Sequence, residues 1–148
     1  MSTATEALCF ETSGAVRDAC LCLHLQRAAR AIARRFDTAF RPLDLTNGQF
    51  SLLMALNRPE PAAMRSVATL LAMDRTTLTA ALKPLERRGL VTVEADPADR
   101  RSRRLNLTEE GRDLLAAALP IWRREHAALN QLLAPGPETL RATLRLLG

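Results

Sequence analysis

A polar-faced helix followed by a charged hairpin, predicted for residues 74–111, constrains the fold of this chain more than any other feature. Residues 75–88 carry leucines at three- and four-residue spacing, which predicts a helix with one apolar face. Two alternating segments, 91–95 and 103–107, flank the turn-rich sequence DPADRRS and predict a hairpin. A helix with a cationic hairpin is one of the few small constructions that can engage both grooves of a DNA duplex. We therefore expect the remainder of the chain to position and regulate this stretch.

Positive charge is concentrated in the same stretch. The whole chain has a formal net charge of +5. Between Arg75 and Arg104 there are eight basic and four acidic residues, a net charge of +4, so the rest of the chain carries only +1. A local excess of cations on a groove-sized element is the electrostatic property of a polyanion-binding protein.

Length and composition indicate one globular domain. The chain has 148 residues, enough to bury a substantial core, and its 47% apolar and 25% charged residues are ordinary for a globular protein. No apolar run approaches the roughly 18 residues that a membrane span needs. The N-terminus lacks a basic start followed by an apolar block. We expect a soluble cytoplasmic protein with no membrane partner.

The sequence contains no motif of a common catalytic site. His24 and His126 are the only histidines, and neither lies in a nucleophile motif. A Gly-rich phosphate loop and a paired-carboxylate pattern are both absent from the sequence. We expect no enzymatic activity, no cofactor and no metal site. A rival hypothesis is a thiol enzyme that uses Cys22 and His24.

Apolar periodicity and helix caps predict about six helices around the two-stranded hairpin, so the expected fold class is mainly α. Residues 1 to about 14 lack periodicity, and the first helix is expected from about Val16 to Pro42. Thr46 and Gln49 fit a capping box, which starts a second helix that is apolar almost all round. The remaining helices are expected at about residues 64–72, 75–88, 108–133 and 138–147.

Several residues within these helices carry more specific expectations. Pro84 should kink the 75–88 helix, and Pro120 should bend the long helix. Leu70 is expected to point inward. Ala72 occupies the turn between two short helices, where glycine is a common choice. Trp122 lies far from the basic stretch and is expected to be a packing anchor.

Residues 46–111 resemble the MarR family of bacterial winged-helix regulators. The resemblance rests on TNGQFSLLMAL as the central helix, MDRTTLTAALKPLERRGLV as the recognition helix and EADPADRRSRRLNLTEEG as the wing. The aspartate-rich turn, the paired arginines and the LT-x-x-G helix start occur in the order and spacing of that family. The resemblance implies a winged helix-turn-helix fold.

The same resemblance implies a domain organisation and a function. Residues 1–148 would form a single MarR-like domain, in which 15–42 and 112–148 are dimerisation helices and 46–111 bind DNA. The protein would be a homodimeric repressor whose subunits each contact half of a pseudo-palindromic operator. A small ligand, bound between the dimerisation helices and the winged region, would release it from double-stranded DNA. The sequence leaves the effector unidentified.

Polar and cationic side chains on the helix and hairpin are the candidate DNA contacts. The candidates are Arg75, Thr76, Thr77, Thr79, Lys83, Arg87, Arg100, Arg101 and Arg103. The resemblance implies that Asp99 and Arg101 form a structural pair in the wing and that Arg101 enters the minor groove. Two other interpretations stay open: the hairpin arginines merely solvate an exposed turn, or the winged helix contacts an acidic protein partner.

Three cysteines, Cys9, Cys20 and Cys22, lie near the N-terminus. They are buried and inert, or they sense oxidants, as in some regulators that the chain resembles, or they bind a metal or metalloid with His24. Side chains two residues apart on a helix point about 200° apart. Cys20 and Cys22 should therefore not bridge each other within one helix, and the same geometry opposes a metal site.

Overall fold

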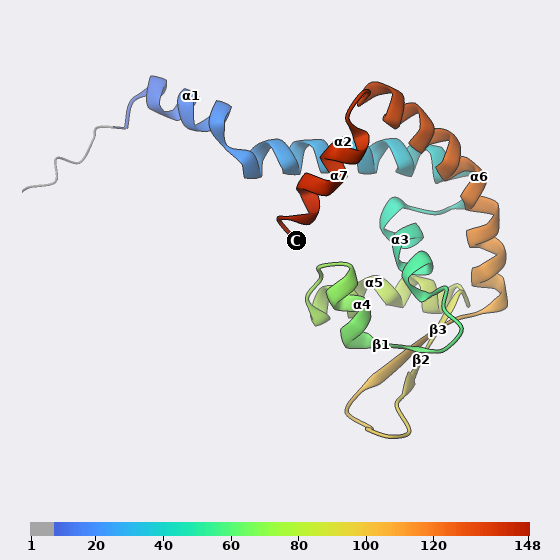
Figure 1. Ribbon diagram of the computed structural model, residues 1–148. Helices are drawn as coiled ribbons and strands as arrows, with labels where there is room; N and C mark the ends of the chain where they lie inside the picture. The colour runs from blue at the N-terminus through green and yellow to red at the C-terminus, as the bar shows by residue number, and fades with distance from the viewer. Residues whose placement is uncertain (1–7) are drawn as a thin grey trace, which may run out of the picture. The chain divides into compact units, whose positions relative to one another are not determined.

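The computed structural model describes residues 8–148 (Figure 1). The described chain divides into two compact units, one ending at Arg35 and one running from Phe36 to Gly148. Its elements, in chain order, are α1 (Phe10–Ala19), α2 (Leu21–Phe40), the 3-10 helix η1 (Arg41–Leu43), α3 (Asn47–Leu56), β1 (Ala62–Ala63), α4 (Met64–Leu70), α5 (Arg75–Arg87), β2 (Val91–Ala95), β3 (Arg103–Leu107), α6 (Glu109–Leu132) and α7 (Pro137–Arg145).

The first unit contains α1, which the sequence did not predict as a separate helix. The Sγ of Cys9 accepts the N–H of Thr12 at 3.4 Å and caps α1, so helix starts at Phe10 instead of about Val16. Cys20 then adopts an extended conformation that ends α1. The single expected N-terminal helix is therefore two helices. The part of the expected lead-in before residue 8 lies outside the described residues.

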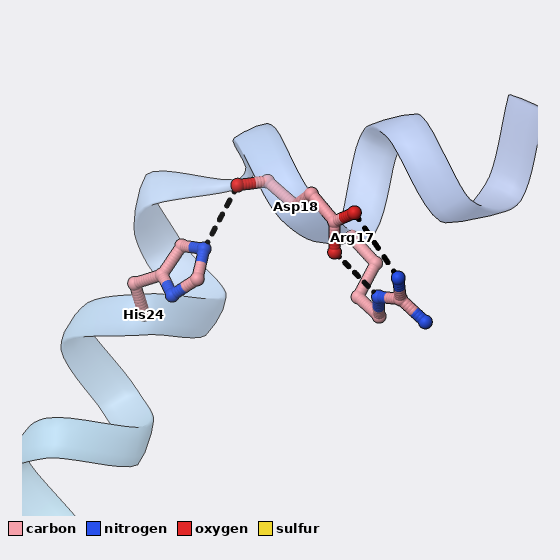
Figure 2. A network of polar contacts seen from close by, with 3 residues as sticks. All are labelled: Arg17, Asp18 and His24. Atoms are coloured by element: carbon pink, nitrogen blue, oxygen red, sulfur yellow. Dashed lines mark hydrogen bonds and ion pairs between the residues drawn. The ribbon is translucent and has the colours of Figure 1, made fainter.

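Polar contacts join α1 to the first turn of α2 (Figure 2). The Nε2 of His24 lies 2.9 Å from the carbonyl oxygen of Asp18. The Asp18 carboxylate accepts from Nε of Arg17 at 2.7 Å, and this bond lowers the pKa of Asp18. Because the ion pair is exposed, it contributes little stability. The His24 contact links the first turn of α2 to the end of α1.

The second unit is built around α3. Thr46 and Gln49 form the expected capping box, in which Gln49 N–H donates to Thr46 Oγ1 at 3.2 Å and Thr46 N–H donates to Gln49 Oε1 at 3.0 Å. The side chains that follow are buried at Phe50, Leu52, Leu53, Ala55 and Leu56. Met54 is the exception, with 55% of its surface exposed. The prediction of a central buried helix is thus confirmed.

The turn between α4 and α5 has a strained residue at Ala72. Its φ of 51° lies in the left-handed region, where a Cβ costs energy and glycine does not. The prediction that Leu70 points inward is wrong, since it is 60% exposed. α4 ends at Leu70, and the half-buried Leu71 packs against the core instead.

The sheet has three strands instead of the expected two. β2 and β3 have the predicted bounds and pair antiparallel, with Val91 opposite Leu107 and Val93 opposite Leu105. The extra strand, β1, pairs with the other edge of β3, so the order is β1-β3-β2. β1 has only two residues, which is too short to show an alternating pattern in sequence. Figure 1 shows the β2–β3 hairpin extending beyond the helices of this unit.

The start of α6 is fixed to the base of the hairpin. The Thr108 hydroxyl accepts the Gly111 N–H at 3.0 Å and donates to the Gly89 carbonyl at 2.7 Å. A Cβ at Gly111 would lie 2.2 Å from the Leu90 carbonyl oxygen. The glycine of the LT-x-x-G sequence therefore permits a helix-to-backbone contact that no other residue allows.

A row of aromatic rings packs α6 against the core. Phe40 stacks on Phe50 with ring centroids 4.9 Å apart, Phe50 on Trp122 at 6.4 Å, and Trp122 on His126 at 4.5 Å. Trp122 is half-buried and packs against the core, so its expected role as a packing anchor is confirmed. α6 continues through Pro120 to Leu132, and Figure 1 shows it as a curved helix.

Apolar side chains remain exposed towards both ends of the chain. In α2, Phe36 and Phe40 are buried, whereas Leu21, four turns earlier, is 72% exposed. Leu140 and Leu144 of α7 are also exposed. None of the helices within residues 8–148 is long and apolar enough to cross a membrane.

Candidate nucleic-acid interface

The exposed helix of the candidate interface, α5, begins at a strong N-cap. The Asp74 carboxylate accepts the Thr77 N–H at 2.7 Å and the Thr77 hydroxyl at 2.8 Å. These bonds stabilise the ionised form, so the pKa of Asp74 lies below its ordinary value. An aspartate cap also interacts favourably with the positive end of the helix dipole.

The two faces of α5 are those that the sequence predicts. Leu78, Leu82 and Leu85 are buried in the core. The opposite face exposes Arg75, Thr76, Thr79, Lys83 and Arg87. The helix continues through Pro84 to Arg87, so the missing backbone donor does not end it.

Two threonines on α5 have their hydroxyl protons already engaged. Thr77 donates to Asp74, and Thr79 donates to the Arg75 carbonyl at 2.7 Å. A hydroxyl has one proton and two acceptor lone pairs. In this state both side chains can accept a hydrogen bond from a base or another donor, but they cannot donate one without giving up an internal contact.

Asp99 organises the tip of the hairpin through the backbone. Its Oδ1 accepts the Arg101 N–H at 3.0 Å, and its Oδ2 accepts the Ser102 hydroxyl at 3.3 Å. The contact between Asp99 and Arg101 thus involves the arginine amide, and the Arg101 side chain is exposed. This arrangement shapes the turn while it leaves the guanidinium group available to a partner.

A second acidic residue, Asp96, closes the base of the tip. Its carboxylate accepts the Ala98 N–H at 2.9 Å and pairs with Nε of Arg104 at 3.1 Å. The Ala98 amide first, and Arg104 second, lower the pKa of Asp96. Asp96 N–H also donates to the Ser102 carbonyl at 3.0 Å. This pair could not be predicted from the sequence, because it depends on which face of β3 each arginine occupies.

Four arginines surround one hollow between α4, the start of α5 and the hairpin. The hollow has a volume of about 160 Å³ and is called here the arginine groove; it is lined by Ala63, Met64, Arg65, Ala68, Arg75, Arg101, Ser102 and Arg103. Arg65 was not predicted as a site residue. The pairing of Ala63 with Arg104 brings the start of α4 beside the hairpin, and β1 was invisible in the sequence.

The other predicted basic residues, Lys83, Arg87 and Arg100, are exposed but do not line the arginine groove. Lys83 and Arg87 follow Arg75 on α5, and Arg100 precedes Arg101 at the hairpin tip. The candidate interface therefore consists of the exposed α5 face, the hairpin tip and the groove between them.

The three cysteines belong to the first unit. All three are free thiols; Cys9 and Cys22 are exposed and Cys20 is half-buried, so the interpretation of buried cysteines is wrong for two of them. Cys20 lies between the helices, so the helical geometry assumed for Cys20 and Cys22 does not apply. Among the residues that the structure describes, no three His, Cys, Asp or Glu side chains are grouped as a metal site would require.

A larger cavity, of about 470 Å³, lies in the second unit. Its apolar walls come from α3, the end of α4 and α6, and its polar groups come from α3 and from the chain just after it. The lining residues are Asn47, Phe50, Ser51, Met54, Ala55, Asn57, Arg58, Leu70, Leu71, Leu119 and Trp122. The exposed Met54 and Leu70, unexpected in a simple core, thus contribute to a cavity wall.

Comparisons with known proteins agree with this arrangement. The model of the MarR family matches residues 45–102. The uncharacterized HTH-type transcriptional regulator YybA of Bacillus subtilis is 30% identical over 121 residues, 78% of either chain. The M. tuberculosis regulator MosR, solved with DNA, superposes with a TM-score of 0.78 at 37% identity, over 86% of this chain and 92% of that one. CouR from Rhodococcus jostii RHA1, solved with p-coumaroyl-CoA, gives a TM-score of 0.70 at 26% identity, over 86% and 88%.

An exposed helix beside a cationic hairpin on a small helical core defines a winged helix-turn-helix DNA-binding protein. The chain belongs to the MarR family and is a DNA-binding transcriptional regulator. α5 is its recognition helix and β2–β3 its wing. Regulators of this family are not enzymes, so the thiol-enzyme hypothesis for Cys22 and His24 is wrong. In the structure these two side chains contact Gln26 and the Asp18 carbonyl, respectively.

Proposed function

We propose that the protein is a cytoplasmic homodimeric repressor that binds a pseudo-palindromic operator and is released by a small ligand. The observation that carries the proposal is the set of exposed cations on α5 and the wing, which have no internal partner. Within residues 8–148, no ion pair engages Arg75, Lys83, Arg87, Arg100, Arg101 or Arg103. Cations without partners on a groove-sized surface favour binding to phosphates.

In this proposal the recognition helix and the wing have different tasks. Arg75, Thr76, Thr77, Thr79, Lys83 and Arg87 face the major groove, where Arg and Thr side chains contact base edges and phosphates. Arg100 and Arg101 at the wing tip approach the minor groove, and Arg103 lies at the base of the tip. Helix contacts would give sequence specificity, and wing contacts would add affinity.

The dimer is proposed from the exposed apolar side chains towards both ends of the chain. Within a single domain, residues 15–42 and 112–148 would form the dimerisation helices on either side of the DNA-binding region 46–111. Leu21, Leu140 and Leu144 are exposed in the isolated chain. A second subunit would cover such surfaces, and apolar area removed from water favours association. A twofold dimer presents two recognition helices, which suits a pseudo-palindromic site.

The small-ligand step is supported by the 470 Å³ cavity. Its volume falls within the roughly 300–1,000 Å³ typical of small-molecule sites. Its walls combine the apolar Phe50 and Leu119 with the polar Asn57 and Arg58. CouR, which the chain resembles, has been solved with p-coumaroyl-CoA. A ligand releases DNA only if it prefers a subunit arrangement that DNA does not.

The test is equilibrium binding to DNA fragments from the region upstream of the coding sequence, followed by fluorescence anisotropy over a range of salt concentrations. The proposal predicts saturable binding to one fragment, as one dimer per site, with a steep decrease in affinity as salt rises. A winged helix that contacts only proteins would show neither. Footprinting of the bound fragment should reveal two half-sites related by an approximate twofold axis.

A further inference from the structure

We propose that the arginine groove is a phosphate-binding site that holds one backbone phosphate of bound DNA, with Arg65 of α4 as a contact outside the recognition helix and wing. This inference rests on the proposed operator binding and deepens it. It names the site at which a single phosphate would touch α4, α5 and the wing together.

The charges of the arginine groove call for an anion. Arg65, Arg75, Arg101 and Arg103 line it, and no acidic residue does. Within residues 8–148, none of these four guanidinium groups forms an ion pair or a side-chain hydrogen bond. Four like charges around one hollow repel one another until a counter-charge is bound. A phosphate group, with several strong acceptor oxygens, matches the planar donor fork of arginine.

Neither acid at the wing tip pairs with a guanidinium group of the groove: Asp99 accepts from the Arg101 amide and the Ser102 hydroxyl, and Asp96 pairs elsewhere. β3 alternates its side chains, so Arg103 shares the face of the buried Leu105, while Arg104 points to the other face. Asp96 pairs with Arg104. The pair therefore neutralises the arginine that is not in the groove and leaves Arg103 without an internal partner.

The dimensions of the groove select a small anion. Its volume of about 160 Å³ is well below the roughly 300–1,000 Å³ of typical sites for small organic ligands. The uncharged side chains of its lining are the exposed Ala63, the buried Met64 and the half-buried Ala68 and Ser102. One phosphate with bound waters fits such a space, and a bulky effector does not.

The test compares Arg65→Gln with a matched control, Arg123→Gln, which removes the same charge from an exposed position on α6. Anisotropy titrations use the operator duplex and an unrelated duplex, each over a range of salt concentrations. Loss of one phosphate contact should weaken binding to both duplexes by the same factor, about three- to tenfold, and reduce the slope of log K against log salt by about one. The control should leave both quantities unchanged, and circular dichroism should show both variants folded.

Three outcomes would contradict the inference while operator binding by the native protein stands. Affinity and salt slope equal to those of Arg123→Gln would mean that no phosphate occupies the groove. Loss of affinity for the operator alone would mean that Arg65 contacts a base edge. If the variant lost the same affinity for both duplexes but its salt slopes for the two differed, the substitution would have altered the whole complex and not one phosphate contact. If the native protein bound no duplex saturably, the proposed function itself would fail.

The source of the phosphate is tested separately. A neutral methylphosphonate linkage is placed at successive positions of the operator backbone. At one position per half-site the linkage and Arg65→Gln should have non-additive effects, because they remove the same contact.

Inorganic pyrophosphate, at constant ionic strength, is the free-ligand probe. If it bound the native protein and not Arg65→Gln, while both bound DNA equally, the groove would hold a free phosphate compound and the assignment to DNA would be wrong.

Discussion

At the scale of single residues, glycine and threonine positions fix the geometry between the wing and α6. Thr108 bonds to both Gly89 and Gly111, and Gly111 contacts the Leu90 carbonyl directly. The sequence alone identified Thr108 as a helix start. It could not show that Gly111 meets backbone from another segment, because that contact depends on tertiary packing.

Gly111→Ala should destabilise the protein by at least about 2 kcal/mol, since the added Cβ would lie 2.2 Å from a backbone oxygen that cannot rotate away. Thermal and urea unfolding measure the change. Gly48→Ala is the matched control, because its Cβ would meet nothing within 4 Å. In the first turn of α3 it should be neutral or stabilising by up to about 1 kcal/mol. Equal stability of the two variants would show that the backbone can yield at Gly111.

The Asp74 cap gives the stability of α5 a pH dependence. Its folded pKa is depressed below the ordinary value of 3.8, so its contribution is complete above that value and is lost as pH falls through the folded pKa. Asp74→Asn keeps an acceptor for the Thr77 amide but has no charge to lose. The difference in melting temperature between the native protein and this variant should be constant from pH 8 to pH 6 and shrink towards pH 3. A difference that stays constant into acid would mean that the carboxylate charge has no role.

At the scale of elements, the wing combines a rigid base with an exposed tip. Its two strands, their bounds and their alternation could be predicted from sequence, because each has five residues of regular pattern. β1 and the Asp96–Arg104 pair could not be predicted from the sequence. The former is two residues long, and the latter depends on strand register. These two missed features explain why Arg65 was not foreseen as a site residue.

Arg101→Ala should weaken operator binding by about tenfold with the fold unchanged, because the Arg101 side chain is exposed and only its amide takes part in the tip. Anisotropy titration and circular dichroism measure the two effects. Arg104→Ala is a second variant for comparison with Arg101→Ala, since it removes the contact to Asp96 at the base of the tip. An unchanged affinity for Arg101→Ala would remove the side chain from the DNA-binding mechanism.

At the scale of the whole molecule, the helices after Thr46 could be predicted from apolar periodicity and helix caps, whereas the break between helices at Cys20 could not. The predicted helices after Thr46 correspond to α3, α4, α5, α6 and α7. The N-terminal pattern is continuous enough to predict one helix, and only the extended backbone of Cys20 divides it. The apolar residues towards the chain ends indicate an interface only because the core leaves them uncovered, and this exposure depends on the tertiary fold.

Leu144→Glu should shift the proposed homodimer towards monomer, because a charge on the exposed apolar face of α7 must be desolvated on association. Sedimentation equilibrium measures the dissociation constant, which should rise at least about tenfold. Operator affinity should fall with it, whereas affinity for an isolated half-site should change little. Leu70→Glu makes the same chemical change on α4 and should leave the dimer intact. If both variants sedimented as the native protein, α7 would not lie in the subunit interface.

The backbone bond between Asp96 and Ser102 closes the wing tip as a five-residue loop, 97–101, on a base that is complete without it. Asp99 organises this loop from inside, and the Asp96–Arg104 pair holds its base. We therefore expect that the length and sequence of this loop can change while the strand register and the core stay the same. In the proposed mode of binding, changes within these few residues would alter contacts to the minor groove while the fold of α5 stays the same.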